Sequence, residues 1–152
     1  MGVGVAESLA RAGHETVLVD VSDGILARSA SQIRSNVRFG RLLGYAGGDA
    51  NRAPAEISYY TDYARLGDVD FVIESVTERW DVKKQVYPLL AAACPEHCVF
   101  AANTSAIPIT RIASATLQVV HGTLCTPRLV RRFPAPIWSA GKITRLIHQH
   151  LV

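Results

Sequence analysis

Two largely apolar runs, residues 69–73 and 98–102, each end in small polar or acidic residues. Apolar runs of this length are typical of buried parallel strands, which come to the surface at the carboxyl edge of their sheet. In an open α/β sheet, ligands bind at that edge. The sequence therefore predicts one crevice whose carboxylates, amide and hydroxyls can bind and orient a hydroxyl-bearing ligand. The residues concerned are Glu74, Glu78, Asn103, Thr104 and Ser105.

A further acidic residue ends a predicted strand near the start of the sequence. Residues 1–13 are expected to form a helix, and residues 15–20 a short strand that ends in Asp20. This order is typical of the second half of a dinucleotide-binding βαβ unit, in which the acid accepts hydrogen bonds from the ribose hydroxyls and repels a 2′-phosphate. Asp20 thus favours NAD over NADP as the cofactor. The alternative is that Asp20 belongs, with Ser22 and Asp23, to a cluster that begins the next helix.

Helical and strand patterns alternate as far as about residue 120. This alternation predicts the α/β class, with a Rossmann-like doubly wound parallel sheet. The helix expected after the second acidic strand end carries an apolar stripe, with Lys83 beside it. That helix is expected over residues 79–93 with Val82, Val86, Leu89 and Leu90 facing the core; the other expected elements are helices over 23–43 and 107–113, a helical turn over 61–64, and strands over 57–60, 69–75, 98–102 and 117–120.

Composition indicates a globular protein of one main domain. The 152 residues are 49% hydrophobic and 19% charged, which argues against a disordered chain. No apolar run approaches the ~20 residues that span a bilayer, and no charged-then-apolar leader precedes the first helix. The three cysteines are too few for a disulfide framework, and the spacing of Cys94, His97 and Cys98 does not favour a metal site. We therefore expect a cytoplasmic protein without a metal or a membrane partner.

Charge is distributed unevenly along the chain. Residues 1–96 hold ten basic and thirteen acidic side chains, whereas residues 97–152 hold six basic side chains and no acidic one. The basic residues of the second part do not alternate with aromatic residues that could stack on bases, so we expect no nucleic-acid partner. Residues 121–152 are interpreted as a basic tail of uncertain structure, in which residues 141–151 could form a short helix.

These motifs, in this order, resemble the NAD-binding domain of the 3-hydroxyacyl-CoA dehydrogenase family. The resemblance extends from residue 1 to about residue 120, and its most specific parts are the Glu-Ser-Val-x-Glu and Asn-Thr-Ser blocks at this separation. The matching segments are Met1-Gly2-x-Gly4-x-Ala6, Gly13-His14 before the strand that ends in Asp20, Asp70 to Glu78, Val82-Lys83, Ala101-x-Asn103-Thr104-Ser105 and Ile109 to Ala113.

The family oxidises the 3-hydroxyl of an acyl-CoA in fatty acid metabolism and passes the hydride to NAD, which requires a base for the hydroxyl proton. The resemblance implies that Gly2 and Asp20 bind the cofactor. It implies that Glu78 and Lys83 lie near the nicotinamide, with Asn103 and Ser105 close to it and to the substrate oxygen. The alternatives are a structural carboxylate for Glu74, a solvated helix face for Lys83, and a helix cap for Asn103 and Ser105.

The sequence also departs from the family pattern at both ends. It starts inside the Gly-x-Gly-x-x-Gly motif, with Gly2 at the last position. In the strand order 3-2-1-4-5-6 the first strand is central, and we expect that strand to be missing, which would leave two half-sheets with unpaired inner edges. We likewise expect no C-terminal helical domain, which in the family supplies substrate contacts and the dimer interface.

The family places its catalytic histidine in a Gly-x-His-Phe-x-Asn-Pro segment. Counting back from Pro127 puts Thr123 at that position, and His121 lies two residues earlier. An offset of two keeps a side chain on the same face of a strand but moves it by ~7 Å. No acid follows Glu96 to orient the imidazole, as the family's glutamate does. His121 is nevertheless the candidate base of this chain.

Three functional hypotheses follow. The first is NAD-dependent oxidation of a 3-hydroxyacyl-CoA to a 3-ketoacyl-CoA by a partial NAD-binding domain over residues 1–120, followed by the tail over residues 121–152. The second is a catalytically inactive dinucleotide domain that acts as a binding or interaction module, pairing its exposed sheet edges with a second copy or another chain. The third is a piece of a related dehydrogenase for sugar acids or carnitine.

Overall fold

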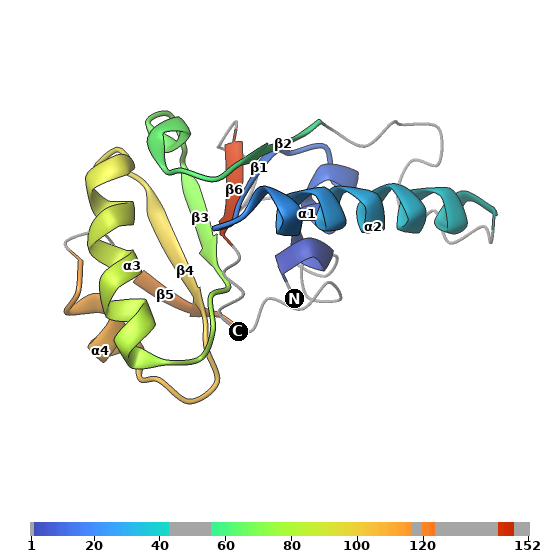
Figure 1. The fold of residues 1–152 in the computed structure, drawn as a ribbon. Helices are drawn as coiled ribbons and strands as arrows, with labels where there is room; N and C mark the ends of the chain where they lie inside the picture. The colour runs from blue at the N-terminus through green and yellow to red at the C-terminus, as the bar shows by residue number, and fades with distance from the viewer. Residues whose placement is uncertain (1, 43–55, 117–119, 124–142, 148–152) are drawn as a thin grey trace.

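Helices and parallel strands alternate along the chain, which confirms the predicted α/β class. The computed structural model describes residues 2–42, 56–116, 120–123 and 143–147 (Figure 1). The predicted strand over residues 117–120 lies outside these residues except for Val120, where the observed strand begins. The elements are α1 (Gly2–Arg11), β1 (Glu15–Val19), α2 (Asp23–Leu42), β2 (Ile57–Tyr60), the 3-10 helix η1 (Ala64–Leu66), β3 (Phe71–Glu74), α3 (Trp80–Ala93), β4 (Val99–Asn103), α4 (Ile109–Ala113), β5 (Val120–Thr123) and β6 (Ile143–Ile147).

The six strands form one parallel sheet in the order β2-β1-β6-β3-β4-β5. This is the doubly wound order 3-2-1-4-5-6, with β6 in the position that the first strand holds in that order. In register, Leu18 of β1 lies opposite Leu146, which lies opposite Ile73 of β3. The expectation of two half-sheets with unpaired inner edges is therefore wrong for this chain.

The expected helix over residues 141–151 is also wrong where the structure describes it, because residues 143–147 are the strand β6. The segment Ile-Thr-Arg-Leu-Ile contains three β-branched residues, which favour a strand over a helix. A gap between two parallel strands also offers unpaired backbone groups on both sides. The proposed division at residue 120 stays a prediction, but β6 and the last three residues of β5 lie in the second range and belong to the sheet of the first.

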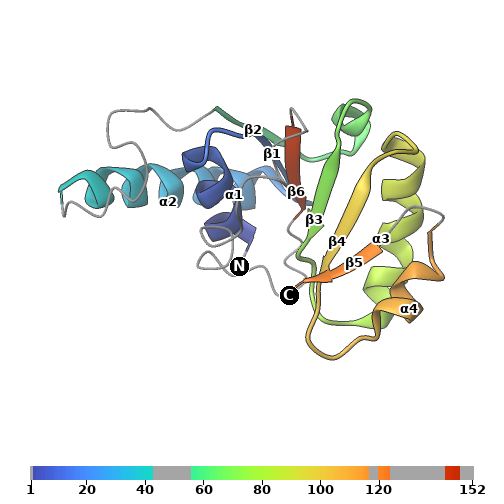
Figure 2. The same cartoon turned by 180° about the vertical axis from the view of Figure 1, so that it is seen from behind.

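Helices cover both faces of the sheet. Neighbouring residues of a strand point to opposite faces, and they divide accordingly between two clusters of buried side chains. Leu18 and Ile73 pack with α1 and α2, whereas Val72 and Phe100 pack with α3 and α4. Figures 1 and 2 show α1 and α2 toward the β2 end of the sheet and α3 and α4 toward the β5 end. Burial on both faces explains why the strands are apolar without alternation.

A tight turn places the start of α1 at the carboxyl edge of the sheet. Gly13 has φ 92°, which favours glycine, and its N–H donates to the carbonyl of Ala10 at 3.0 Å, while the N–H of His14 donates to the carbonyl of Leu9 at 3.1 Å. These two bonds form a Schellman ending of the helix, so the chain reverses directly into β1. Because α1 then runs antiparallel to β1, its first residue, Gly2, lies near the carboxyl end of that strand.

Among the described residues, no helix combines the length and apolarity needed to cross a membrane.

The central place of β6 predicts that Leu146→Pro will destabilise the protein. Proline donates no ladder hydrogen bond and leaves a buried carbonyl without its partner, which costs about 2–4 kcal/mol in a central strand. Leu146→Val, which keeps the N–H and introduces a β-branched side chain that suits a strand, is the matched control. Urea unfolding followed by circular dichroism measures both variants, and an unchanged midpoint for the proline variant would place residues 143–147 outside the sheet.

Candidate functional site at the carboxyl edge of the sheet

The predicted strand-end residues meet at one edge, because the strands are parallel and in register. Val19 at the end of β1 lies level with Ile147 of β6, which lies level with Glu74 of β3. Asn103 ends the next strand and lies opposite Thr123 of β5. The side chain of Asn103, which is 6% exposed, donates from Nδ2 to the Ser75 hydroxyl at 3.4 Å. The ends of β3 and β4 are therefore in direct contact.

Asp20 follows the last residue of β1 and is buried, with 2% of its surface exposed. Its Oδ1 accepts a hydrogen bond from the backbone N–H of Val21 at 2.7 Å, and its own N–H donates to the carbonyl of Tyr60 at 3.2 Å. The first bonds of α2 are accepted instead by the carbonyl of Ser22. Asp20 thus holds a fixed carboxylate between the ends of β1 and β2, at the position where a dinucleotide-binding unit contacts a ribose.

Glu78 connects the segment after β3 to the loop after β4. Its Oε1 accepts hydrogen bonds from the Thr104 hydroxyl and from the backbone N–H groups of Ser105 (3.1 Å), Ala106 (3.0 Å) and Ile107 (3.3 Å). Burial raises the pKa of Glu78, but these hydrogen bonds and the positive charge of Lys83 outweigh it, so the pKa lies below its ordinary value. The Glu78 carboxylate therefore fixes the shape of the loop over residues 104–107.

This loop carries Ser105, whose side chain is exposed. Thr104 stabilises the loop further, because its Oγ1 accepts a hydrogen bond from the N–H of Ile107 at 3.0 Å. The N-cap residue of α4 is Pro108, and no side chain caps that helix. The structure thus gives neither Asn103 nor Ser105 the helix-capping role that was considered as an alternative, and it leaves the Ser105 hydroxyl at the surface of the edge.

Glu74, Lys83 and Tyr87 form a buried polar group beneath the edge. The Lys83 ammonium donates to both carboxylate oxygens of Glu74, at 2.8 and 2.7 Å, and the Tyr87 hydroxyl donates to Oε2 at 2.9 Å. The N–H of Val76 donates to Oε1 at 2.6 Å. All three side chains are fully buried. Glu74 is therefore a structural carboxylate, though it binds side chains along α3 rather than the N–H groups at the start of that helix.

The inner face of α3 differs from the predicted stripe. Leu89, expected in the core, is 53% exposed, while Lys83 is buried along with Tyr87. The buried residues of α3 do recur at helical spacing: they are Lys83, Val86, Tyr87 and Leu90. The sequence pattern therefore contained this stripe, but a lysine is buried in a core only when a carboxylate neutralises its charge. The solvated-face alternative for Lys83 is wrong. A contact of Lys83 with a cofactor stays a prediction.

Burial also changes the protonation of this group. Burial raises the pKa of Glu74 above its ordinary value, while Lys83, Tyr87 and the N–H of Val76 act in the opposite direction. Burial and the negative charge of Glu74 raise the pKa of Tyr87, which therefore keeps its proton and acts as a donor.

The two remaining candidates lie at the ends of the matched region. Gly2 begins α1 and is buried. His121 lies within β5, where its backbone is level with Ala101, and Thr123 lies level with Asn103 at the edge. The side chain of His121 is outside the described part of the structure, so its role as a base stays a prediction.

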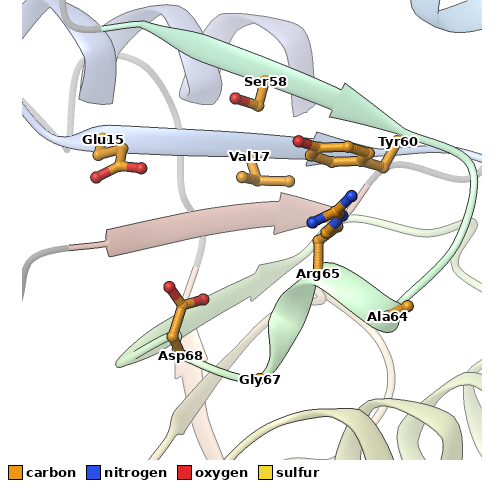
Figure 3. Close-up of a pocket in the computed structure, with 8 residues that line it drawn as sticks. All are labelled: Glu15, Val17, Ser58, Tyr60, Ala64, Arg65, Gly67 and Asp68. Atoms are coloured by element: carbon orange, nitrogen blue, oxygen red, sulfur yellow. The ribbon is translucent and has the colours of Figure 1, made fainter.

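A cavity of about 410 Å³ lies over β1, β2 and η1 (Figure 3). Figure 3 shows the Arg65 side chain beside the Tyr60 ring; the guanidinium carbon lies 5.5 Å from the ring centre. None of the predicted site residues lines this cavity, whose walls are Glu15, Val17, Ser58, Tyr60, Ala64, Arg65, Gly67 and Asp68.

Within the described residues, no three histidine, cysteine or acidic side chains come together in a way that could hold a metal ion. Cys94 and Cys98 are buried, reduced thiols, and His97 pairs with Asp70 at 3.2 Å.

Comparison with known proteins gives a consistent result. The family model described as "3-hydroxyacyl-CoA dehydrogenase, NAD binding domain" matches residues 1–122. The mitochondrial hydroxyacyl-coenzyme A dehydrogenase of Sus scrofa is 36% identical over 125 residues, which cover 78% of this chain and 40% of that protein. The 3-hydroxyadipyl-CoA dehydrogenase of Escherichia coli (strain K12) is 36% identical over 118 residues, covering 75% of this chain and 24% of that protein.

Solved structures show the same relationship. FadB2 of M. tuberculosis superposes with a TM-score of 0.69 at 28% identity, covering 79% of this chain and 44% of that chain. The (S)-3-hydroxybutyryl-CoA dehydrogenase of Ralstonia eutropha superposes with a TM-score of 0.74 over 99% of this chain and 60% of that chain; at 23% identity it supports the fold. The chain spans about 40% of the length of the Sus scrofa relative.

The hydrogen bonds at Glu78 predict how its carboxyl group titrates. Because the folded-state pKa lies below the ordinary value, the stabilisation from these bonds is present above the ordinary glutamate pKa of about 4.3 and is lost as the pH falls through the folded-state value. NMR titration of the carboxyl carbon measures this pKa directly. We expect Thr104→Val, which removes one donor, to raise it, and Ser114→Ala, at an exposed position beyond α4, to leave it unchanged. A Glu78 pKa at or above the ordinary value in the unsubstituted protein would contradict the geometry.

Proposed function

We propose that this chain, which belongs to the 3-hydroxyacyl-CoA dehydrogenase family through its NAD-binding domain, forms the cofactor-binding part of an enzyme that oxidises a 3-hydroxyacyl-CoA to a 3-ketoacyl-CoA. NAD is the cofactor. The observation that carries the proposal is the meeting of Asp20, Asn103 and the loop held by Glu78 at one carboxyl edge. The acyl-CoA substrate is proposed from the names of the relatives.

The residues at this edge fit a dinucleotide. The Asp20 carboxylate is an acceptor for the ribose hydroxyls, and its negative charge disfavours a 2′-phosphate. Gly2 begins a helix at the same edge, and the N–H groups of a first helical turn are donors for a pyrophosphate. These two groups lie on successive elements, α1 and β1, in the order that the dinucleotide-binding unit requires.

The groups at the far side of the edge suit the reacting end of the cofactor. When bound, NAD accepts the hydride from the substrate carbon. The amide of Asn103 and the hydroxyl of Ser105 offer donors and acceptors that orient the nicotinamide and the substrate oxygen without crowding them. Glu78 holds Ser105 in place by binding the backbone of its loop. We propose His121 as the group that removes the hydroxyl proton.

A second function, an NAD-binding module without turnover, is favoured by one specific observation. No acidic residue occurs between residues 97 and 152, so this range offers no carboxylate to orient His121. On this reading the outer edges of the sheet, β2 and β5, are the surfaces for a second copy or another chain.

We also propose a cytoplasmic location. The buried, reduced thiols of Cys94 and Cys98 suit a reducing compartment. Relatives include proteins named as mitochondrial and peroxisomal, so fractionation of cells that express the tagged protein is the deciding measurement.

Calorimetric titration of the purified chain with NAD tests the cofactor site. We expect saturable binding that Asp20→Asn weakens about ten- to a hundredfold, the effect of losing charge-assisted hydrogen bonds to the ribose. Asp23→Asn, which removes an exposed carboxylate three residues away, should change the affinity less than twofold. Binding unaffected by Asp20→Asn, or no binding at millimolar NAD, would refute the proposed cofactor site.

Turnover distinguishes the two functions. Loss of NADH absorbance in the presence of a short 3-ketoacyl-CoA reports the reverse reaction. We expect slow activity in the 152-residue chain that His121→Ala abolishes while NAD affinity is retained. NAD binding with no measurable activity would instead identify the chain as a binding module.

A further inference from the structure

We infer that Glu74 and Lys83 form a buried positioning pair, which holds the cofactor edge in shape. This inference rests on the proposed function for its meaning. It concerns two residues whose side chains are each fully buried and which bind one another through two hydrogen bonds.

An ion pair is not needed for stability at this buried position. A buried pair loses the hydration of both charges, and a well-packed apolar pair of similar size is often as stable or more stable. Stability of the α3–β3 contact therefore does not explain why this chain keeps a glutamate and a lysine there. The role of the pair must therefore lie in the effect of its charges and hydrogen bonds on neighbouring residues.

One side of the pair holds the backbone that leaves β3. The Glu74 carboxylate accepts the N–H of Val76 at 2.6 Å, and Lys83 and Tyr87 hold that carboxylate against α3. Residues 75–78 are thereby tied to the helix. Ser75 in this segment accepts the hydrogen bond from Asn103, so the end of β4 is linked to the same carboxylate through one intervening residue.

The other side of the pair acts on Glu78. The Lys83 ammonium has three N–H groups, and within the described residues both of its acceptors are oxygens of Glu74. Its positive charge is also felt by the Glu78 carboxylate, which favours the charged form that binds residues 104–107. The buried ammonium group that binds Glu74 thus also stabilises the charged form of Glu78.

The two effects converge on the loop that carries Ser105. Glu74 acts through the backbone from Val76 onwards, and Lys83 acts through the charge of Glu78. A neutral pair of the same volume would leave the packing of α3 intact while removing both effects, which separates positioning from packing.

The deciding variant is the double substitution Glu74→Gln with Lys83→Met. Each single substitution leaves a buried group without its partner and is expected to destabilise the fold, whereas the double variant buries no charge and is expected to recover most of the unfolding midpoint. Lys84→Met is the matched control, because Lys84 lies next to Lys83 on α3 and is exposed. Tyr87→Phe, which removes one donor to Glu74 and keeps the ring against Phe100, is a milder second variant.

Two measurements report on the edge without NAD. In the double variant we expect the pKa of Glu78 to rise toward its ordinary value and the backbone amides of residues 105–107 to exchange faster with solvent. Tyr87→Phe should change the exchange in the same direction by less, and Lys84→Met should change neither quantity. If the double variant refolds but leaves the Glu78 pKa and the amide exchange unchanged, the pair is only structural and the inference is overturned.

A third measurement connects the pair to the cofactor. We expect the double variant to bind NAD about tenfold more weakly, roughly the effect of one lost charge-assisted hydrogen bond. Full affinity in a refolded double variant would overturn the inference while leaving the proposed function standing. Absence of NAD binding in the unsubstituted chain would refute the proposed function, and the Glu78 pKa and amide exchange would then decide the positioning role alone.

Discussion

A parallel sheet that binds a ligand at its carboxyl edge depends on an unbroken row of paired strands. In this chain that row is completed by β6, which pairs in parallel with β1 on one side and with β3 on the other. The strand comes from the far end of the sequence, yet it takes the central place of the doubly wound order. Without it, Asp20 on one half of the sheet and Asn103 on the other would have no fixed relation.

Two glutamates, one at the end of β3 and one four residues later, stabilise different parts of the edge. Glu74 lies inside, where a lysine, a tyrosine and a backbone N–H satisfy its carboxylate. Glu78, four residues later, lies at the surface, where its carboxylate accepts hydrogen bonds from the backbone N–H groups of the loop after β4. Their environments move the two pKa values in opposite directions, because burial dominates at Glu74 and hydrogen bonding dominates at Glu78. The same residue type thus fixes the backbone that follows β3 at one position and the loop that follows β4 at the other.

Much of the fold and of the candidate site could be predicted from the sequence. The α/β class, the helix over residues 23–43 and the strand over 57–60 followed from local patterns, and the structure confirms them within one residue. The gathering of strand-end residues at one edge followed from the rule for parallel sheets. The helix expected over residues 141–151 was wrong because a short apolar segment fits either period, and only the gap between β1 and β3 selects the strand. From the sequence, Lys83 was expected beside the apolar stripe of its helix and not in it, because a lysine is buried only when a carboxylate neutralises it. That carboxylate, Glu74, lies in another element.

The sequence by itself determined the types of the elements and the chemistry of their ends, because hydrophobic period, turn residues and strand-end acids act over a few neighbouring positions. It therefore determined that Asp20, Glu78, Asn103 and Ser105 belong to one edge. Only the tertiary structure decided which strand lies at the centre of the sheet, that Lys83 is buried against Glu74, and that one oxygen of Glu78 receives the N–H groups of a loop 27 to 29 residues away. These contacts join segments far apart in the chain, and no local pattern encodes which distant partner will satisfy a backbone edge or a buried charge.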